Sequence, residues 1–403
     1  MKQVTPAEAA LLAPVDPARM LARTLAWSAI NSGTGNLVGL ATVADQLAGA
    51  FAALPGEVAL HDPTQVTAID AEGREMERAH GRHLVLRVRP DAAKRVLLTG
   101  HMDTVYPADH PFQQIDWLDD ATIRGPGTAD MKGGIAVMLE ALTAFESSPD
   151  AALLGYDVLI NSDEETGSLS SAQLLATLAQ GKAAALTYEP SALPDGTLAH
   201  ARGGSGNYAL TFRGRSAHAG RNPQDGRNAI VAAADCAVRL KAMGHAQMSV
   251  NPARIDGGSG NNVVPDLAVL RFNIRPRSNA AADDFARDLI DLLRDIEVRH
   301  EVGIHTDGGI TRPPKPVDAR AQRLFDMVRE CGAALGQQIG WKDSGGVCDG
   351  NNIAACGVPV VDTMGVRGGA IHSPDEYLIV SSLAERAHLS ALVLHRLATG
   401  EAP

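Results

Sequence analysis

The sequence has few aromatic residues and few cysteines. Phe, Trp and Tyr together make up 4% of the 403 residues, and there are four cysteines. The cysteines, Cys236, Cys331, Cys348 and Cys356, lack paired metal-binding spacing and are too few for a disulfide scaffold. We therefore expect reduced thiols in a cytoplasmic protein.

Long apolar runs and excess positive charge are also missing. No stretch reaches transmembrane length, and the N-terminus has no basic start followed by a long apolar core, so we expect neither a membrane span nor a signal peptide. A net charge of −11 argues against a nucleic-acid or anionic-membrane partner. The chain has 403 residues, of which 45% are hydrophobic and 21% charged. It is longer than a single hydrophobic core usually supports, which predicts two domains.

Side chains of the types that bind metals stand just after short apolar runs. Residues 95–99, 156–160 and 183–186 have the pattern of buried strands, and open α/β sheets hold their sites at the carboxyl ends of strands. The candidate residues are His101, Asp103, Asp130, Glu164, Glu165, Glu189 and His372. Together they predict a two-metal hydrolytic site.

Each candidate taken alone has a simpler interpretation. His101 and Asp103 have the i, i+2 spacing that lets the carboxylate accept the imidazole N–H, but such a pair is usually two exposed polar side chains or a capping arrangement. Asp130 ends a glycine-rich turn and could cap the helix that follows it. Adjacent acids Glu164 and Glu165 could form a solvated pair, or could face different ways, one toward a metal and one toward a water. The concurrence of these residues at separate strand ends favours the metal site.

Six segments of the sequence resemble motifs of the M20 metallopeptidase family. The similarity is greatest to the glutamate carboxypeptidase branch, with acetylornithine deacetylase-like and succinyl-diaminopimelate desuccinylase-like enzymes as relatives. It runs from about residue 95 to the C-terminus, in the family's order. The segments are 100–105 (GHMDTV), 127–134 (GTADMKGG), 163–168 (DEETGS), 188–190 (YEP), 214–220 (GRSAHAG) and 371–373 (IHS).

The resemblance implies an α/β catalytic domain of the zinc-exopeptidase type with two Zn²⁺ ions per subunit. The implied ligands are His101 and Glu189 on one ion, Glu165 and His372 on the other, and Asp130 between them. Glu164 would be the general base, and Asp103 would orient a ligand histidine. Zinc suits this mixture of imidazole and carboxylate, whereas calcium and magnesium favour an all-oxygen shell; cobalt or manganese could substitute.

Between residues 202 and 312 the pattern is that of a separate α+β domain. Strands are expected at 208–212, 248–255, 267–274 and 300–305, and helices at 228–243 and 281–298. The order β-α-β-β-α-β is the ferredoxin-like signature, and the glycine-rich linker 256–262 would be a tight reversal. We therefore predict a catalytic domain from residues 1–201 and 313–403, ending in a helix over 380–397, with residues 202–312 inserted.

In M20 enzymes such an insertion is a lid and commonly a dimerisation surface, so the resemblance implies a homodimer. His218 matches the family histidine that reaches the partner subunit's active site and polarises the carbonyl. Arg312 matches the position that grips the substrate's α-carboxylate, for which a guanidinium fork is suited. Asn262 and Arg275 match other positions near the substrate. Alternatively, Asn262 only satisfies its turn and Arg275 only pairs with a surface acid.

One departure from the family concerns specificity. Members that demand a C-terminal glutamate can carry a lysine shortly after the equivalent of Glu189, and residues 191–199 contain none. The leading hypothesis is therefore a relaxed amidase that releases an amino acid with a free carboxylate from a peptidyl or N-acyl group. The alternative is a deacylase of a small acetylornithine-like or succinyl-diaminopimelate-like intermediate. A non-catalytic metal-binding relative is disfavoured because Glu164 and His218 are both present.

Overall fold

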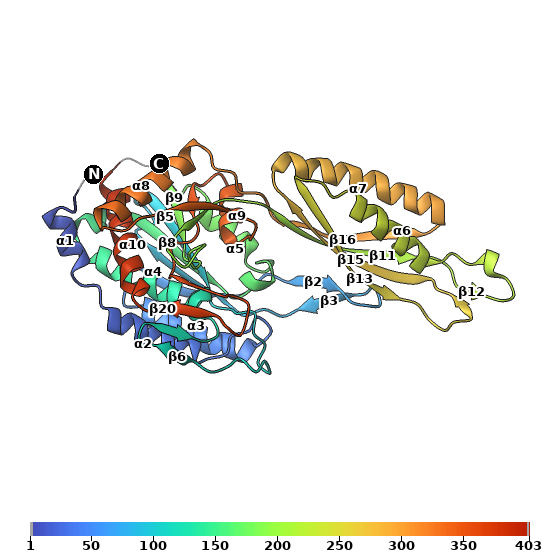
Figure 1. Ribbon diagram of the computed structural model, residues 1–403, viewed down its shortest axis with the longest axis horizontal. Helices are drawn as coiled ribbons and strands as arrows, with labels where there is room; N and C mark the ends of the chain where they lie inside the picture. The colour runs from blue at the N-terminus through green and yellow to red at the C-terminus, as the bar shows by residue number, and fades with distance from the viewer. Residues whose placement is uncertain (1–2, 401–402) are drawn as a thin grey trace.

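An α/β unit made from both ends of the chain lies beside a smaller unit made from its middle (Figure 1). The computed structural model describes residues 3–400 and 403. The chain leaves the α/β unit after Arg202 and re-enters it before Lys315. At this point the two residues exchange backbone N–H···O bonds of 3.0 and 2.9 Å. The two crossing segments therefore lie side by side.

The α/β unit is built on a mixed six-stranded sheet in the order β1-β4-β8-β5-β9-β18. In that order the strands are Glu57–His61, His83–Val88, Gly155–Asn161, Arg95–His101, Ala184–Thr187 and Val360–Val361. β5 runs parallel to β8 and β9, whereas β4 is antiparallel to its neighbours. The predicted strands at 95–99, 156–160 and 183–186 are confirmed. Because β8, β5 and β9 are parallel neighbours, their carboxyl ends meet at one edge of the sheet.

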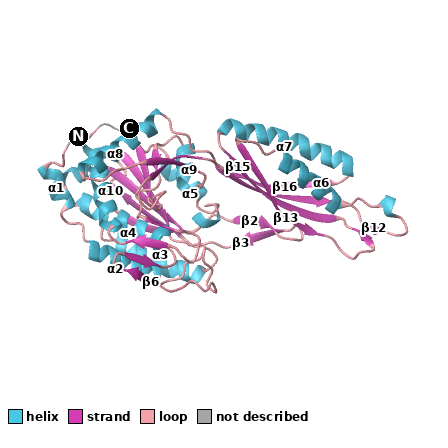
Figure 2. Cartoon of the chain, viewed as in Figure 1, coloured by secondary structure: helices cyan, strands magenta, loops and turns pink. Residues whose placement is uncertain are grey.

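Helices cover both faces of this sheet (Figure 2). They are α1 (Pro6–Leu12), α2 (Pro17–Ser28), α3 (Leu37–Phe51), α4 (Gly133–Glu146), α5 (Ala172–Ala179), α8 (Ala319–Ala334), α9 (Asp349–Ala355) and α10 (Ser382–Thr399). Neighbouring strand residues point to opposite faces, so Leu98 packs in the cluster that includes α4 and α10 while Leu97 packs with α5 and α9. The final helix agrees with its prediction to within two residues at each end.

The inserted unit, residues 205–312, has an antiparallel sheet in the order β13-β15-β11-β16. The strands are Met248–Gly257, Leu267–Pro276, Ser205–Arg213 and Gly303–Arg312, and the helices are α6 (Ala229–Ala242) and α7 (Asn279–His300). The helices bury Leu210, Phe272 and Leu289 in a core separate from that of the α/β unit. The predicted order of strands and helices is present.

Two details of this unit differ from the prediction. α7 continues through His300, so the last strand begins at Gly303 rather than at residue 300, after Glu301 turns the chain with a φ of 51°. The linker 256–262 is not a tight reversal, because it leads into β14 (Val263–Val264), which pairs with β12 (Ala217–His218). Together β12 and β14 form an arm at the far tip of the unit (Figure 1).

A hairpin of the α/β unit, β2 (Val66–Ile69) and β3 (Glu75–Arg78), reaches across to the inserted sheet (Figure 1). Arg271 of β15 donates from Nη2 to the carbonyl oxygens of Ile69 at 2.9 Å and Asp70 at 2.8 Å. This hairpin is a third connection between the units, in addition to the two crossings of the chain. No sequence pattern predicted it.

Two small sheets and four short helical turns complete the α/β unit and the arm. The sheets pair β19 (Gly368–Gly369), β20 (Tyr377–Ile379), β7 (Thr122–Arg124) and β6 (Asp116–Asp119), and β10 (Leu198–Arg202) with β17 (Trp341–Ser344). The turns are η1 (Thr128–Lys132), η2 (Pro149–Leu153), η3 (Glu164–Thr166) and η4 (Pro223–Asp225).

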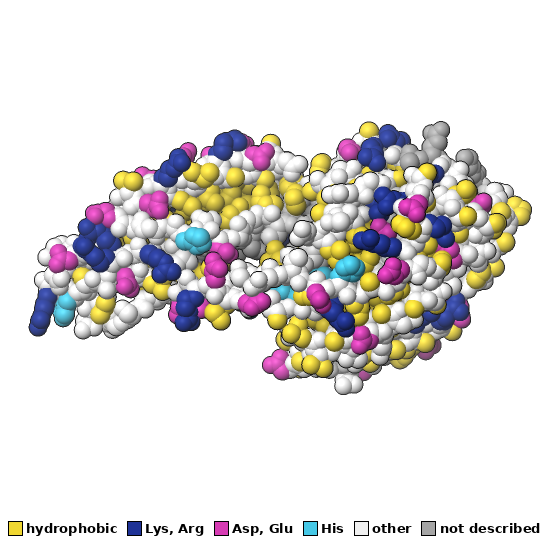
Figure 3. All heavy atoms as spheres, turned by 180° about the vertical axis from the view of Figure 1, so that it is seen from behind, with side chains coloured by type: hydrophobic (Ala, Val, Ile, Leu, Met, Phe, Trp, Pro, Cys, Tyr) yellow, Lys and Arg dark blue, Asp and Glu magenta, His cyan; other side chains and the backbone are white. Residues whose placement is uncertain are grey.

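The face seen in Figure 3 carries side chains of both charge signs over both units. Within residues 3–400 and 403, none of the helices combines the length and the apolar character needed to cross a membrane.

Candidate metal centre

The structure brings the five predicted metal ligands together beyond the strand ends. His101 is the last residue of β5, and Glu165 lies on η3 just after β8. Glu189 follows β9, Asp130 lies on η1 before α4, and His372 lies in the loop between β19 and β20. Segments that are far apart in sequence therefore meet at one edge of the sheet.

The two carboxylate oxygens of Asp130 face different imidazoles. Oδ1 lies 3.1 Å from Nε2 of His101, and Oδ2 lies 3.2 Å from Nε2 of His372. A carboxylate that presents one oxygen to each of two donor groups has the arrangement required of a ligand shared by two cations.

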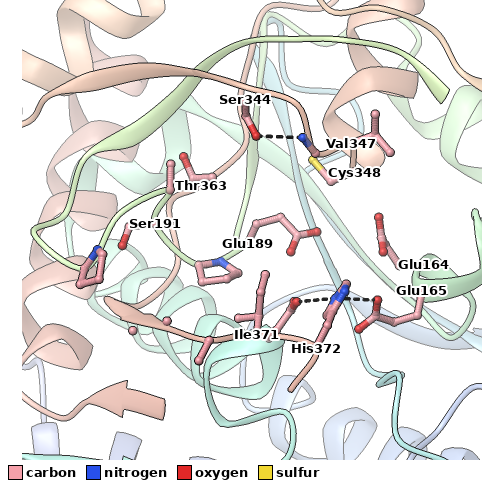
Figure 4. A pocket seen from close by; sticks show the side chains of 18 of the residues that line it. Glu164, Glu165, Glu189, Ser191, Ser344, Val347, Cys348, Thr363, Ile371 and His372 are labelled. Carbon is pink, nitrogen blue, oxygen red and sulfur yellow. Dashed lines mark hydrogen bonds and ion pairs between the residues drawn. The ribbon is translucent and has the colours of Figure 1, made fainter. Parts of the chain in front are cut away.

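Each imidazole has a second carboxylate beside it. Oε2 of Glu189 lies 3.6 Å from Nε2 of His101, and Oε2 of Glu165 lies 3.2 Å from Nε2 of His372. Figure 4 shows His372 and Glu165 joined by a dashed line, with Glu189 beside them in the pocket. The donor atoms thus form two neighbouring groups with Asp130 between them.

The centre gathers several carboxylic acids in a buried place, where burial disfavours their charged forms. Burial raises the pKa of Glu165 to about 7, with the charge of Asp130 contributing, and burial also raises the pKa values of Glu189 and Glu164. Hydrogen bonds to Asp130 and Glu165 raise the pKa of His372 to about 11. Four carboxylates around two imidazoles therefore form a site with a deficit of positive charge.

This donor set fits divalent cations. Ligand atoms of His101, Asp130 and Glu165 lie within 4.8 Å of one another, as do those of His101, Glu164 and Glu189. A cation between them would remove the repulsion among the acids, and a mixture of imidazole nitrogen and carboxylate oxygen is a shell that zinc accepts.

Asp103 holds the turn that carries the two adjacent acids. Its carboxylate accepts the backbone N–H groups of Glu164 and Glu165, each at 3.2 Å, and the hydroxyl of Thr34 at 2.7 Å. Nδ1 of His101 lies 3.0 Å from the backbone carbonyl oxygen of Asp103 and 3.4 Å from the nearer carboxylate oxygen. The imidazole therefore has its shorter contact with the carbonyl, whereas the sequence analysis expected the carboxylate.

Glu164 and Glu165 face different ways. Glu165 turns toward His372, whereas Glu164 accepts a hydrogen bond of 2.7 Å from Nη2 of Arg312. Arg312 is 2% exposed, and its other nitrogen donates to Asp349 at 2.6 Å. In this structure the Arg312 guanidinium is thus bound by protein acids, and it does not line the cavity beside the centre.

A cavity of about 460 Å³ opens beside the candidate ligands (Figure 4). Ser191, Ser344, Thr363 and Cys348 line it, as do Ile371, His372 and Tyr377. Arg202 is the one Lys or Arg side chain that lines it in the described part of the chain. Nε and Nη2 of Arg202 donate to the carboxylate of Asp362 at 2.8 and 3.0 Å.

Comparison with known proteins identifies the family. The model of peptidase family M20/M25/M40 matches residues 97–396, about three quarters of the chain. The chain belongs to this family. It is accordingly a metal-dependent hydrolase, with an α/β fold like that of solved M20 peptidases.

The similar proteins include two curated enzymes and a solved tripeptidase structure. Carboxypeptidase G2 of Pseudomonas sp. (strain RS-16) is 28% identical over 80% of this chain and 78% of its own length. A succinyl-diaminopimelate desuccinylase of Xanthomonas oryzae pv. oryzae is 27% identical over 75% of this chain and 83% of its own. The crystal structure of a tripeptidase from Staphylococcus aureus superposes with a TM-score of 0.73 at 24% identity, over 96% of this chain and 100% of that one.

The remaining predicted residues of this M20 chain lie in the inserted unit, away from the cavity. His218 is exposed on β12 and accepts the N–H of Gly220 at Nδ1, 3.1 Å away. Asn262 precedes β14 and accepts the N–H of Ala219 at its backbone carbonyl. Arg275 is exposed on β15 and donates to Asn273 at 2.9 Å. Within one chain, none of these three residues lines the cavity.

Two buried residues near the centre were not foreseen from the sequence. Burial lowers the pKa of Lys132 to about 7, and its Nζ donates to the carbonyl oxygen of Ile30 at 2.9 Å. Glu376 is buried beside the turn of Asp130. The sequence offered one signal, because Lys132 and Glu376 each follow a candidate ligand closely. Charged residues of both kinds are common on protein surfaces, so this signal did not single them out.

Proposed function

We propose that this M20 family member is a di-zinc hydrolase of the amide bond in a peptide or N-acyl amino acid with a free carboxylate. The observation that carries the proposal is the placement of Asp130, whose two oxygens face the imidazoles of His101 and His372 at 3.1 and 3.2 Å. A shared carboxylate of this kind is what a two-metal hydrolytic site requires.

The residues would divide between two ions. His101 and Glu189 would hold one, Glu165 and His372 the other, and Asp130 both. Such ions, when bound, lower the pKa of a water molecule and polarise the scissile carbonyl. The nitrogen and oxygen donors favour Zn²⁺, with Co²⁺ or Mn²⁺ as substitutes.

Glu164 would be the general base. Its carboxylate is at the cavity, and burial raises its pKa, which suits a group that must first accept a proton and then give it up. The hydrogen bond from Arg312 to Oε1 fixes the side chain, so that Oε2 is the oxygen that would take the proton from water. Glu164 would then pass that proton to the nitrogen of the leaving amine.

A free carboxylate on the substrate needs a cation. Arg202 lines the cavity, and together with Lys315, 3.0 Å from Asp362, it leaves one net positive charge beside the wall. Arg312 keeps its predicted role of gripping the α-carboxylate only if the substrate displaces Glu164 or Asp349 from its guanidinium. The cation already at the cavity wall makes Arg202 the first candidate in this structure.

We further propose that residues 202–312 act as a lid and that the protein is a cytoplasmic homodimer. His218 lies on the arm at the far tip of the inserted unit (Figure 1), so a role in catalysis requires a second chain whose cavity it would approach. Asn262 on the same arm would accompany it, and Arg275 would meet the substrate from the lid sheet.

The relatives include a carboxypeptidase and a desuccinylase. This pair supports amide hydrolysis as the reaction and leaves two classes of substrate to consider. A carboxypeptidase and a desuccinylase both have names that describe cleavage of an amide bond. The similarity to the desuccinylase favours, as a second candidate, a deacylase of a small biosynthetic intermediate. The neutral wall formed by Ser191, Ser344 and Thr363 offers no second cation for a longer acidic acyl group, so we place the peptide or N-acyl amino acid first.

The test is amine release by the zinc-loaded protein from dipeptides, N-acetyl and N-succinyl amino acids and folyl-glutamate-type amides, repeated after chelation. Cleavage of one subset should depend on metal. Replacing Glu164→Gln should lower kcat by roughly 10²–10⁴-fold at unchanged metal content. Glu140→Gln, a buried acid of α4 outside the cavity, is the matched control and should stay active. Turnover that is unaffected by Glu164→Gln, or by chelation, would refute the mechanism.

A further inference from the structure

One buried acid lies beside the metal centre without belonging to its ligands. Glu376 is 1% exposed and follows His372 by four residues. Its Oε1 accepts the backbone N–H groups of Ala129 and Asp130, each at 3.0 Å, and its Oε2 accepts that of Gly127 at 3.1 Å. A single carboxylate thus satisfies three N–H groups of the turn that carries the shared ligand.

A second segment reaches the same carboxylate. Tyr106, five residues after His101, shares its one hydroxyl proton between the carbonyl oxygen of Ser373 at 2.8 Å and Oε2 of Glu376 at 3.1 Å. With four hydrogen bonds accepted, both oxygens of Glu376 are occupied. The side chain is therefore placed to hold backbone segments rather than a cation.

The main chain of Glu376 is held as firmly as its side chain. Its carbonyl oxygen accepts the N–H of Gly125 at 3.1 Å, and its own N–H donates to Ser373 at 3.1 Å. The next residue, Tyr377, begins β20 and pairs with Arg124 of β7. The small sheet therefore sets the position from which the carboxylate reaches the turn.

We propose that Glu376 is a positioning residue of the metal centre. It ties the turn of Asp130 to the loop of His372 and, through Tyr106, to the segment that follows His101. These three segments carry the three residues whose side chains must face one another, and they are joined at one carboxylate. The inference rests on the proposed function, because it assumes that the centre binds metal.

The physical consequence concerns the direction of the Asp130 side chain. Successive backbone N–H groups that point to one side form a concavity suited to an anion, and Glu376 fills it from within the protein. Without that anion the three buried N–H groups lose their acceptor, and the turn relaxes toward another conformation. Asp130 then no longer presents one oxygen to each imidazole.

The test is Glu376→Gln in the full-length protein. The amide keeps the size of the side chain and one acceptor oxygen, but it sets an NH₂ group against N–H donors. We expect zinc affinity, measured by competition with a chromogenic chelator, to fall by about 10–100-fold. The visible absorption bands of the cobalt-loaded protein should shift, and kcat should fall while KM changes little.

Glu140→Gln is the matched control. Glu140 is also 1% exposed and accepts a backbone N–H, that of Asp16, at 2.9 Å, but it lies outside the cavity. It should lower the melting temperature without changing zinc affinity or the cobalt spectrum. Tyr106→Phe removes one of the four hydrogen bonds to Glu376 and should produce the same spectral change to a smaller extent, and it decides the matter if Glu376→Gln fails to fold.

The proposal is overturned if Glu376→Gln and Tyr106→Phe bind zinc as tightly as the unchanged protein and give the same cobalt spectrum. Failure of the proposed function has a different signature. In that case the unchanged protein would cleave no amide in the substrate panel. The zinc affinities of the variants would still test whether Glu376 positions the metal centre.

Discussion

His372 is held in a conformation that few side chains adopt. Its φ is 62°, in the left-handed region, and its side chain lines the cavity and is 52% exposed. Hydrogen bonds to Asp130 and Glu165 raise the pKa of His372 to about 11, and the acids around His101 raise the pKa of His101 well above its usual value although burial opposes this shift. Both imidazoles therefore carry protons where a metal would bind.

Metal binding should consequently release protons and strengthen as the pH rises. Below pH 11 the proton on His372 competes with the cation, so the apparent affinity falls as the pH falls. At pH 7 we expect about two protons to be released per centre, one from each imidazole, with a further fraction from Glu165. Calorimetric titration in buffers of different ionisation enthalpy measures this number.

His372→Gln is the informative variant in that titration. It should release about one proton fewer and bind only one ion tightly. Binding of zinc without proton release would show that the imidazoles are neutral before the metal arrives, contrary to their contacts with Asp130.

At the residue scale, the sequence predicted the candidate ligands that the structure brings together, but not the residues that hold them in place. His101, Asp130 and His372 stand in recognisable local motifs at strand ends or turns. Gly127, which donates to Glu376, is 249 residues away in sequence, and Glu164 and Asp349 are 148 and 37 residues from Arg312, so no local pattern predicts these contacts. Contacts of this kind follow from how the segments pack.

At the scale of secondary-structure elements, the hairpin of β2 and β3 is the main feature that the sequence did not predict. It crosses from the α/β unit to the open face of the inserted sheet, where Arg271 donates two hydrogen bonds to its carbonyl groups and also pairs with Asp256. A cationic donor serving two backbone acceptors at a junction between units should limit their relative movement.

Arg271→Met should therefore loosen the junction. We expect a loss of about 2 kcal/mol in the free energy of unfolding, because hydrogen bonds from charged groups are removed. Amide hydrogen exchange over residues 66–78 should become faster. Arg254→Met, which removes an exposed arginine that also contacts Asp256, is the control. Equal effects of the two variants would mean that the ion pair, and not the hairpin contact, is responsible.

The sequence predicted the elements whose periodicity is strong. The central strands and the helices of the inserted unit agree with their patterns because each buries a regular set of apolar side chains. The hairpin could not be predicted, since β3 is exposed along its whole length and carries no apolar alternation. The linker 256–262 looked like a turn because its glycines permit both a turn and an arm.

At the scale of the whole molecule, His218 lies on β12 in the inserted unit (Figure 1), whereas the residues that line the cavity belong to the α/β unit. If His218 acts in the partner's cavity, as proposed, two inactive variants should complement each other. A subunit with His218→Ala keeps its own Glu164, and a partner with Glu164→Gln keeps its own His218. One complete site then forms in each mixed dimer.

Mixing the two variants after reversible dissociation should restore about a quarter of the unchanged activity, because half of the dimers are mixed and each has one complete site of two. Light scattering should show a mass of twice the 42.2 kDa chain. Activity that stays at the level of the separate variants would place His218 outside the partner's site.

The side-by-side crossing at Arg202 and Lys315 also bears on the order in which the protein forms during synthesis. The inserted unit has its own hydrophobic core, and the chain enters and leaves this unit at one point. The unit is therefore complete once residue 312 has left the ribosome. The α/β unit must wait for α10, which packs on α4 and supplies much of its core. Domains generally fold as units as the chain emerges. The middle of this chain should therefore reach its native structure before either end does.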